Sequence, residues 1–244
     1  MSSWRLGSSL GIDPVSCKEK FCTFDCIYCQ LGETKVFRDK REVFVPTEKL
    51  IEEVKSLPPL KIDYITFSGR GEPTLSENLG EMIRQIKKIR KERIAVLTNS
   101  SLIGKRDVQR DLSLADFVMT KLDVCSEESF QKINRPMPGI TFDKIIKGIK
   151  EFRSEHKGRL SLQIMFIEKN KIYAPEIARI AKDIDPDEVQ INTPLRPCQE
   201  GPLSRQEIDI IKRYFEGMNI ISVYEAENKQ VESLSKGDTL KRRG

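Results

Sequence analysis

Three of the six cysteines lie within eight residues of one another, and this is the part of the chain that most directly indicates chemistry. Cys22, Cys26 and Cys29 follow the spacing Cys-x3-Cys-x2-Cys, so one loop can present three thiolates to one metal centre. A cubane [4Fe-4S] cluster has four irons, and three thiolates leave one iron without a protein ligand. The spacing therefore predicts an iron-sulfur cluster with one coordination position open to a small molecule.

Other roles for the same cysteines remain open at this point. Cys17 precedes Cys22 by a Cys-x4-Cys spacing and could supply a fourth thiolate, which would close the cluster or complete a structural zinc site. A closed site would indicate a non-catalytic electron carrier or a metal-stabilised binding module. The only histidine, His156, lies far along the chain, and we expect it to be exposed at a helix end. Cys125 and Cys198 stand alone, and we expect them to be packing residues.

A glycine-rich loop forms the second candidate feature. Gly69-Arg70-Gly71-Glu72-Pro73 follows a short apolar run. Glycines allow the backbone to approach a ligand closely, and a carboxylate with nearby carbonyl groups can hold an ammonium group. Taken alone, the same residues also suit a simple turn before a helix.

Short apolar runs alternate with amphipathic runs after the cysteine loop, which is typical of βα units on a parallel sheet. The predicted strands are 64–68, 94–98, 117–122, 160–167, 188–192 and 220–224. The predicted helices are 47–56, 79–90, 105–112, 127–133, 141–155, 174–183 and 204–215, the last with a capping box of Ser204 and Glu207. Six or seven such units are too few for a closed barrel of eight. We therefore predict an α/β fold, an open partial βα barrel with the cysteine loop near one end of its first strand.

Polar residues occur where the predicted strands end. Because parallel strands place their carboxyl ends at one rim, these residues should lie near a bound ligand: Ser68, Thr98, Asn99, Asp123, Glu168 and Asn192. Arg135 and Arg196 precede prolines in loops near the same rim. A guanidinium group there could bind a carboxylate or a phosphate, although a surface arginine explains each position equally well.

The cysteine spacing, with Tyr28 directly before the last cysteine, resembles the signature of radical S-adenosylmethionine (SAM) enzymes. The loop at Gly69–Pro73 is similar to that family's Gly-Gly-Glu-Pro motif, except that Arg70 interrupts the pair of glycines. The resemblance implies a [4Fe-4S] cluster on Cys22, Cys26 and Cys29, and SAM on the open iron. It also implies a 5'-deoxyadenosyl radical and an electron donor such as flavodoxin or ferredoxin. The implied SAM contacts are Tyr28, Gly69, Gly71, Glu72, Asn99, Ser100, Asp123 and Asn192.

Four further stretches resemble a subgroup related to the wyosine-forming tRNA enzymes: Ser-Leu-Gly-Ile-Asp-Pro, Cys-Gln-Leu-Gly, Ile-Asn-Arg-Pro and Gln-Ile-Asn-Thr-Pro-Leu-Arg-Pro. Those enzymes have additional N-terminal cysteines for a second cluster, whereas this chain has only Cys17 there. The resemblance implies one radical SAM domain over 1–244, with a cluster loop at 11–32 and a flexible tail at 228–244. It implies a macromolecular substrate, either tRNA or protein, with a small metabolite as the alternative.

Composition sets broad limits on the protein. The 42 basic and 37 acidic residues give a net charge of +5, which is mild for 244 residues and does not by itself require a nucleic-acid partner. No apolar run approaches the ~20 residues that span a membrane, and the first ten residues lack the apolar centre of a secretory signal. We therefore expect a cytoplasmic protein without a membrane partner.

Overall fold

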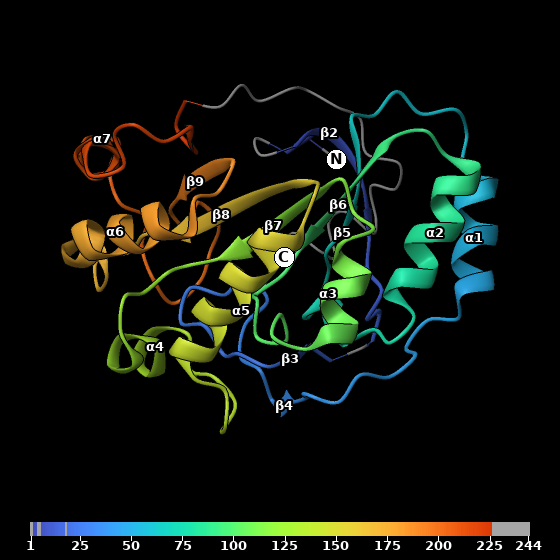
Figure 1. The fold of residues 1–244 in the computed structure, drawn as a ribbon, viewed down its shortest axis with the longest axis horizontal. Coiled ribbons are helices and arrows are strands. Elements are labelled where there is room, and N and C mark those ends of the chain that lie inside the picture. The colour runs from blue at the N-terminus through green and yellow to red at the C-terminus, as the bar shows by residue number, and fades with distance from the viewer. Residues whose placement is uncertain (1, 4–5, 18, 226–244) are drawn as a thin grey trace.

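An open, mostly parallel sheet forms the centre of the computed structural model, which describes residues 2–3, 6–17 and 19–225 (Figure 1). The spatial order of its strands is β1 (Ser2–Ser3), β2 (Gly7–Ile12), β5 (Tyr64–Phe67), β6 (Arg93–Leu97), β7 (Phe117–Lys121), β8 (Arg159–Met165), β9 (Glu188–Asn192) and β10 (Ile220–Ser222). Strand β1 is antiparallel to β2, and the seven strands from β2 to β10 are parallel. The sheet remains open in the described part of the chain, which confirms the predicted partial barrel.

Seven α-helices accompany the sheet, and Figure 1 shows them following its outer side from α1 and α2 to α6 and α7. Their bounds are α1 (Thr47–Ser56), α2 (Leu79–Ile89), α3 (Arg106–Leu112), α4 (Glu127–Ile133), α5 (Phe142–Glu155), α6 (Ala174–Ile184) and α7 (Arg205–Arg213). The count refers to the residues that the structure describes. The capping box predicted for Ser204 and Glu207 is present at the start of α7.

The core lies between the sheet and these helices. Strands β6 and β7 are buried on both faces, and this burial explains why 94–97 and 117–119 are continuous apolar runs instead of alternating patterns. Each helix contributes one apolar stripe. In α2 that stripe consists of Leu79, Met82, Ile83 and Ile86, all of which are fully buried.

The strand register brings the carboxyl ends of the parallel strands together. Phe67 of β5 pairs with Val96 of β6, and Met165 of β8 pairs with Asn192 of β9, in each case at or next to the last residue of the strand. Loops that leave these ends therefore share one rim. The cysteine loop adds a small two-stranded sheet of β3 (Phe21–Cys22) and β4 (Val36–Phe37).

Two sequence expectations need comment. Strand β2 lies outside all the predicted strand ranges, although a first strand before the cysteine loop was expected. The segment 228–244, expected to be a flexible tail, lies outside the described residues. Across the described chain, no helix combines the length and the apolarity that crossing a membrane requires.

Candidate active site

The three clustered cysteines lie in the loop that begins at β3. All three are free thiols, and Cys29 closes a turn in which its N–H donates to the Cys26 carbonyl at 2.9 Å. Burial raises the pKa of Cys22 to about 12 and that of Cys26 to about 11. Without a metal these two thiols therefore keep their protons at neutral pH, and metal binding would have to displace those protons.

A segment that follows α4 holds the cysteine loop in place. This segment, residues 133–137, contains the Ile-Asn-Arg-Pro sequence, for which only the subgroup resemblance and an anion contact of Arg135 were predicted. Three backbone N–H groups join it to the cysteine loop: Asp25 N–H donates to Asn134 O at 3.0 Å and to Arg135 O at 3.1 Å, Ile27 N–H donates to Ile133 O at 3.0 Å, and Met137 N–H donates to Thr23 O at 2.8 Å. The Arg135 guanidinium lies 3.5 Å from the Asp25 carboxylate, so its nearest acidic partner is in the cysteine loop itself.

The glycine-rich loop after β5 packs directly against the residue before Cys22. A Cβ atom at Gly71 would lie 1.9 Å from the Phe21 carbonyl oxygen, and a Cβ atom at Gly69 would lie 2.1 Å from Asp13 Oδ1. The Arg70 N–H donates to Asp13 Oδ2 at 3.1 Å. Close packing of backbone against backbone therefore explains Gly71, while Gly69 makes room for the Asp13 carboxylate.

Glu72 is buried, with 2% of its surface exposed, and its carboxylate bonds residues of its own loop and of the loop after β6. It accepts hydrogen bonds from Thr74 Oγ1 at 2.7 Å, from Thr98 Oγ1 at 2.6 Å and from the Asn99 N–H at 2.7 Å. Burial raises the pKa of Glu72, and these hydrogen bonds oppose the rise. The carboxylate thus fixes the end of β6 relative to the glycine-rich loop.

A second buried carboxylate, Asp123, follows β7 and connects the cysteine loop to β8. Asp123 Oδ2 accepts hydrogen bonds from the Tyr28 hydroxyl and, at 3.1 Å, from Asn134 Nδ2, while Oδ1 accepts from the Met165 N–H at 2.8 Å. Lys121 lies 3.7 Å from the same carboxylate and 4.7 Å from the centre of the Tyr28 ring. Burial raises the pKa of Tyr28 well above its ordinary value, so the phenol stays protonated.

The remaining predicted rim residues divide into two groups. Ser100 is fully buried, has a φ of 70°, and accepts a hydrogen bond from the Lys121 N–H at 3.2 Å. Asn192 is also buried, and its Oδ1 accepts from the Thr193 N–H at 2.9 Å. Glu168, in contrast, is exposed and forms an ion pair with Lys171 at 2.7 Å. The structure therefore buries Ser100 and Asn192 at the strand ends and leaves Glu168 on the surface.

A pocket of about 420 Å³ opens beside the cysteine loop at the carboxyl ends of the strands. Its charged lining residues are two cations, Lys121 and Arg196. The other lining residues are Tyr28, Cys29, Gln30, Leu31, Gly69, Gln163, Met165 and Pro197. The same pocket is therefore lined by Cys29, by Gly69, which is a predicted SAM contact, and by the loop after β9.

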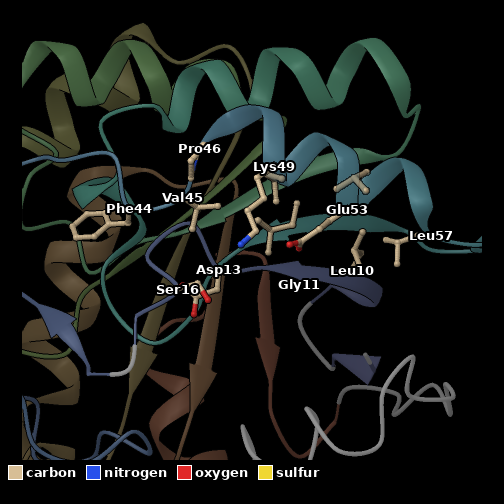
Figure 2. Close-up of a pocket in the computed structure, with 13 residues that line it drawn as sticks. Leu10, Gly11, Asp13, Ser16, Phe44, Val45, Pro46, Lys49, Glu53 and Leu57 are labelled. Carbon is tan, nitrogen blue, oxygen red and sulfur yellow. The ribbon is translucent and has the colours of Figure 1, made fainter.

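A second pocket, of about 340 Å³, lies between β2 and α1 (Figure 2). Figure 2 shows Lys49 and Glu53 extending from α1 toward β2, with Asp13 at the end of that strand. Asp13 also bonds the glycine-rich loop, but no candidate cysteine lines this pocket. We therefore place the candidate active site at the pocket that contains Cys29.

The donor set suits an iron-sulfur cluster. Three thiols from one loop are supplied, and side-chain amides of Asn99 and Asn134 approach two of the sulfurs. No three His, Cys, Asp or Glu side chains in the described part of the chain converge as a single metal ion would require. Thiolates that bind different irons of a cubane do not need to converge in this way. Cys17, the possible fourth ligand, is half-buried five residues before Cys22.

Comparisons with known proteins give a consistent result. The sequence model described as the Radical SAM superfamily matches residues 20–186. UPF0026 protein slr1464 of Synechocystis is 41% identical over 207 residues, which cover 84% of this chain and 77% of the relative. UPF0026 protein MJ1312 of Methanocaldococcus jannaschii is 38% identical over 218 residues, covering 86% of this chain and 67% of the relative.

Two solved structures share the fold at low sequence identity. Streptococcus suis SuiB bound to S-adenosylmethionine gives a TM-score of 0.67 at 15% identity, over 88% of this chain and 50% of SuiB. Native anSMEcpe with bound AdoMet gives 0.66 at 19% identity, over 88% of this chain and 64% of that protein. The chain thus spans 50% and 64% of the length of these two proteins.

Proposed function

Because the chain belongs to the radical SAM superfamily, we propose that Cys22, Cys26 and Cys29 bind a [4Fe-4S] cluster whose fourth iron binds SAM. The observation that carries this proposal is the position of Cys29, which lies in the same loop as the half-buried Cys22 and Cys26 and also lines the pocket at the strand ends. When reduced, the bound cluster supplies the electron that cleaves SAM to methionine and a 5'-deoxyadenosyl radical. A flavodoxin or a ferredoxin is the proposed electron donor.

The residues of this chain would bind SAM and exclude water from the reaction. We assign SAM to the rim at the strand ends, where its proposed contacts are Tyr28, Gly69, Gly71, Glu72, Asn99, Ser100, Asp123 and Asn192. Glu72 and Asp123 would act by positioning the loops around SAM, because their carboxylate oxygens already bond to the protein. A primary carbon radical reacts with almost any C–H bond, so the buried walls of the half-barrel must exclude water and orient one substrate hydrogen.

For the substrate we propose a macromolecule, with tRNA as the first to test. Two observations support a large substrate that carries negative charge. The charged residues that line the pocket, Lys121 and Arg196, are both cationic, which favours a substrate that carries phosphate or carboxylate groups. The open side of the half-barrel would let one residue of a large substrate enter while the rest stays outside. The resemblance to the wyosine-forming enzymes points to tRNA, and a protein or a small anionic metabolite is the alternative.

The chemistry is tested by anaerobic reconstitution with iron and sulfide, reduction with dithionite and addition of SAM. We expect formation of 5'-deoxyadenosine by the parental protein and by Cys198→Ala, whose thiol donates to the Glu200 carbonyl at 3.1 Å. We expect none from Cys26→Ala. A loaded, reducible cluster that gives no 5'-deoxyadenosine and an EPR spectrum unaffected by SAM would instead indicate an electron carrier.

The substrate is tested separately by mass spectrometry of RNA and protein from a deletion strain. A missing tRNA modification that returns with the parental gene, but not with the Cys26→Ala gene, is the expected result. If tRNA is bound directly, its affinity should fall steeply as salt increases, because counterions are released from its phosphates. A missing protein modification with intact tRNA would replace tRNA by protein as the substrate.

A further inference from the structure

Two asparagine side chains lie against the sulfurs of the two buried cysteines. Asn134 Nδ2 is 3.4 Å from Cys26 Sγ, and Asn99 Nδ2 is 3.5 Å from Cys22 Sγ. The asparagines come from different parts of the fold, since Asn134 follows α4 and Asn99 follows β6. Each buried thiol therefore has its own amide donor.

The orientation of the Asn99 amide is fixed by its oxygen. Asn99 Oδ1 accepts a hydrogen bond from the Ser101 N–H at 2.9 Å, so the NH₂ group must point the other way. On that side it donates to Thr23 Oγ1 at 2.8 Å and reaches Cys22 Sγ. The Thr23 hydroxyl in turn donates to Ser101 Oγ at 2.7 Å. This closed arrangement keeps the amide nitrogen, not the oxygen, toward the sulfur.

The orientation of Asn134 is fixed by its neighbours. Its Nδ2 lies 3.1 Å from Asp123 Oδ2 and 3.1 Å from the Tyr28 hydroxyl oxygen, as well as beside Cys26. A reversed amide would place its oxygen against a carboxylate, which is repulsive. The backbone of Asn134 is held as well, because its carbonyl accepts from the Asp25 N–H of the cysteine loop.

These donors bear on the electronic properties of a bound cluster. Reduction adds one negative charge, part of which resides on the cysteine sulfurs, and an N–H donor stabilises the reduced state more than the oxidised state. We propose that Asn134 and Asn99 are positioning residues that raise the reduction potential of the cluster by donating hydrogen bonds to Cys26 and Cys22. The inference rests on the proposed cluster and is independent of the substrate.

The first test replaces each donor with an apolar side chain of similar size. Asn134→Leu and Asn99→Leu are reconstituted, their iron content is measured, and their midpoint potentials are determined by EPR-monitored redox titration. Each should shift to a more negative potential at unchanged iron content, and the double variant should shift further. Asn170→Leu is the matched control, because Asn170 is buried like Asn134 but its Nδ2 bonds the carbonyls of Asp123 and Met165. Its potential should match that of the parental protein.

A second test uses the unmodified chain, so a variant that fails to fold does not decide the outcome. The protein is labelled with ¹⁵N in the asparagine side-chain amides, and the reduced cluster is studied by pulsed EPR. A ¹⁵N coupling is expected, because two amide nitrogens lie within 3.5 Å of the sulfurs of Cys22 and Cys26, which would bind the cluster. Absence of that coupling, or parental potentials in loaded variants, overturns the inference. Neither result would affect 5'-deoxyadenosine formation, so the proposed function is tested apart from it.

Discussion

The Glu72 carboxylate accepts a hydrogen bond from the backbone N–H of Asn99 at 2.7 Å, and this contact joins the loops that follow two adjacent strands. The same carboxylate accepts hydrogen bonds from Thr98, the first residue of the loop after β6, and from Thr74 in its own loop. A residue that the family resemblance assigns to SAM thus also has a structural role in this chain. Its replacement should affect folding as well as catalysis.

Replacing Glu72 with Ala should lower the free energy of unfolding by about 3 kcal/mol, because it leaves buried donors without a partner. Denaturant unfolding measures this change. Glu128→Ala is the control, since the Glu128–Lys132 pair at 2.7 Å is exposed on α4, where water and salt screen it, and should contribute little to stability. Equal, small losses in both variants would show that the Glu72 network does not stabilise the fold.

The cluster ligands can be separated from the other cysteines by iron analysis. Ala at Cys22, Cys26 or Cys29 should abolish retention of the cluster, whereas Cys17→Ala should keep about four irons per chain. The reason is that the three cysteines share one loop, while Cys17 lies in the preceding turn, where its N–H donates to the Val15 carbonyl at 2.7 Å. Loss of iron from Cys17→Ala, to the same extent as from Cys26→Ala, would indicate a closed four-thiolate site.

Much of the fold could be predicted because local signals agreed with one another. Helix α1 matches its predicted bounds, since an amphipathic run ends shortly before Pro58 and Pro59. Strand β9 also matches its predicted bounds, with Val189 and Ile191 alternating with polar residues. Strand β2 did not give such a signal. Its first three residues, Gly-Ser-Ser, favour a loop, its large apolar residues are confined to Leu10 and Ile12, and its pairing with β5 depends on residues more than fifty positions away.

From the sequence, the residues of the candidate site could be predicted, but the contacts between them could not. Sequence motifs identified the cysteines, Glu72 and Asp123, but they gave no sign that Glu72 bonds Thr98 or that Asp123 bonds Tyr28. The role of Asn134 was missed altogether. Its sulfur contact crosses 108 positions of the chain, and no local periodicity reports such a contact.

Gly71 tests whether the glycine-rich loop is required for packing. Gly71→Ala should lower the free energy of unfolding by about 3 kcal/mol and reduce cluster loading, because the new Cβ would lie 1.9 Å from the Phe21 carbonyl oxygen. Gly201→Ala is the control, since a Cβ atom there meets no atom within 4 Å. Thermal or denaturant unfolding of both variants measures the difference. If both Ala variants matched the parental protein, the close approach of Gly71 to Phe21 would not exist in solution.

The sequence prediction for His156 was right about its place at the end of a helix but wrong about its exposure. It was expected to be exposed at a helix end, but only 6% of its surface is exposed. Its ring stacks on Phe152 with a centroid distance of 4.6 Å, and neither ring nitrogen has a hydrogen-bond partner among the described residues. Strand β8 begins at Arg159, three residues after His156, so the chain turns back toward the sheet there. This turn buries a side chain that the helical pattern of the sequence did not predict to be buried.

This burial should make stability depend on pH. Burial lowers the pKa of His156, so the folded state binds a proton less readily than the unfolded chain, whose histidine has its ordinary value of 6.5. The contribution to stability is therefore fully present above pH 6.5 and is lost as the pH falls below it toward the folded-state pKa. His156→Phe keeps an aromatic ring on Phe152 and removes the titration. Because His156 is the only histidine, the difference between the two proteins isolates its contribution. Unfolding free energies measured from pH 8 to pH 5 should fall more steeply for the parental protein than for His156→Phe, and parallel curves would contradict the burial of this side chain.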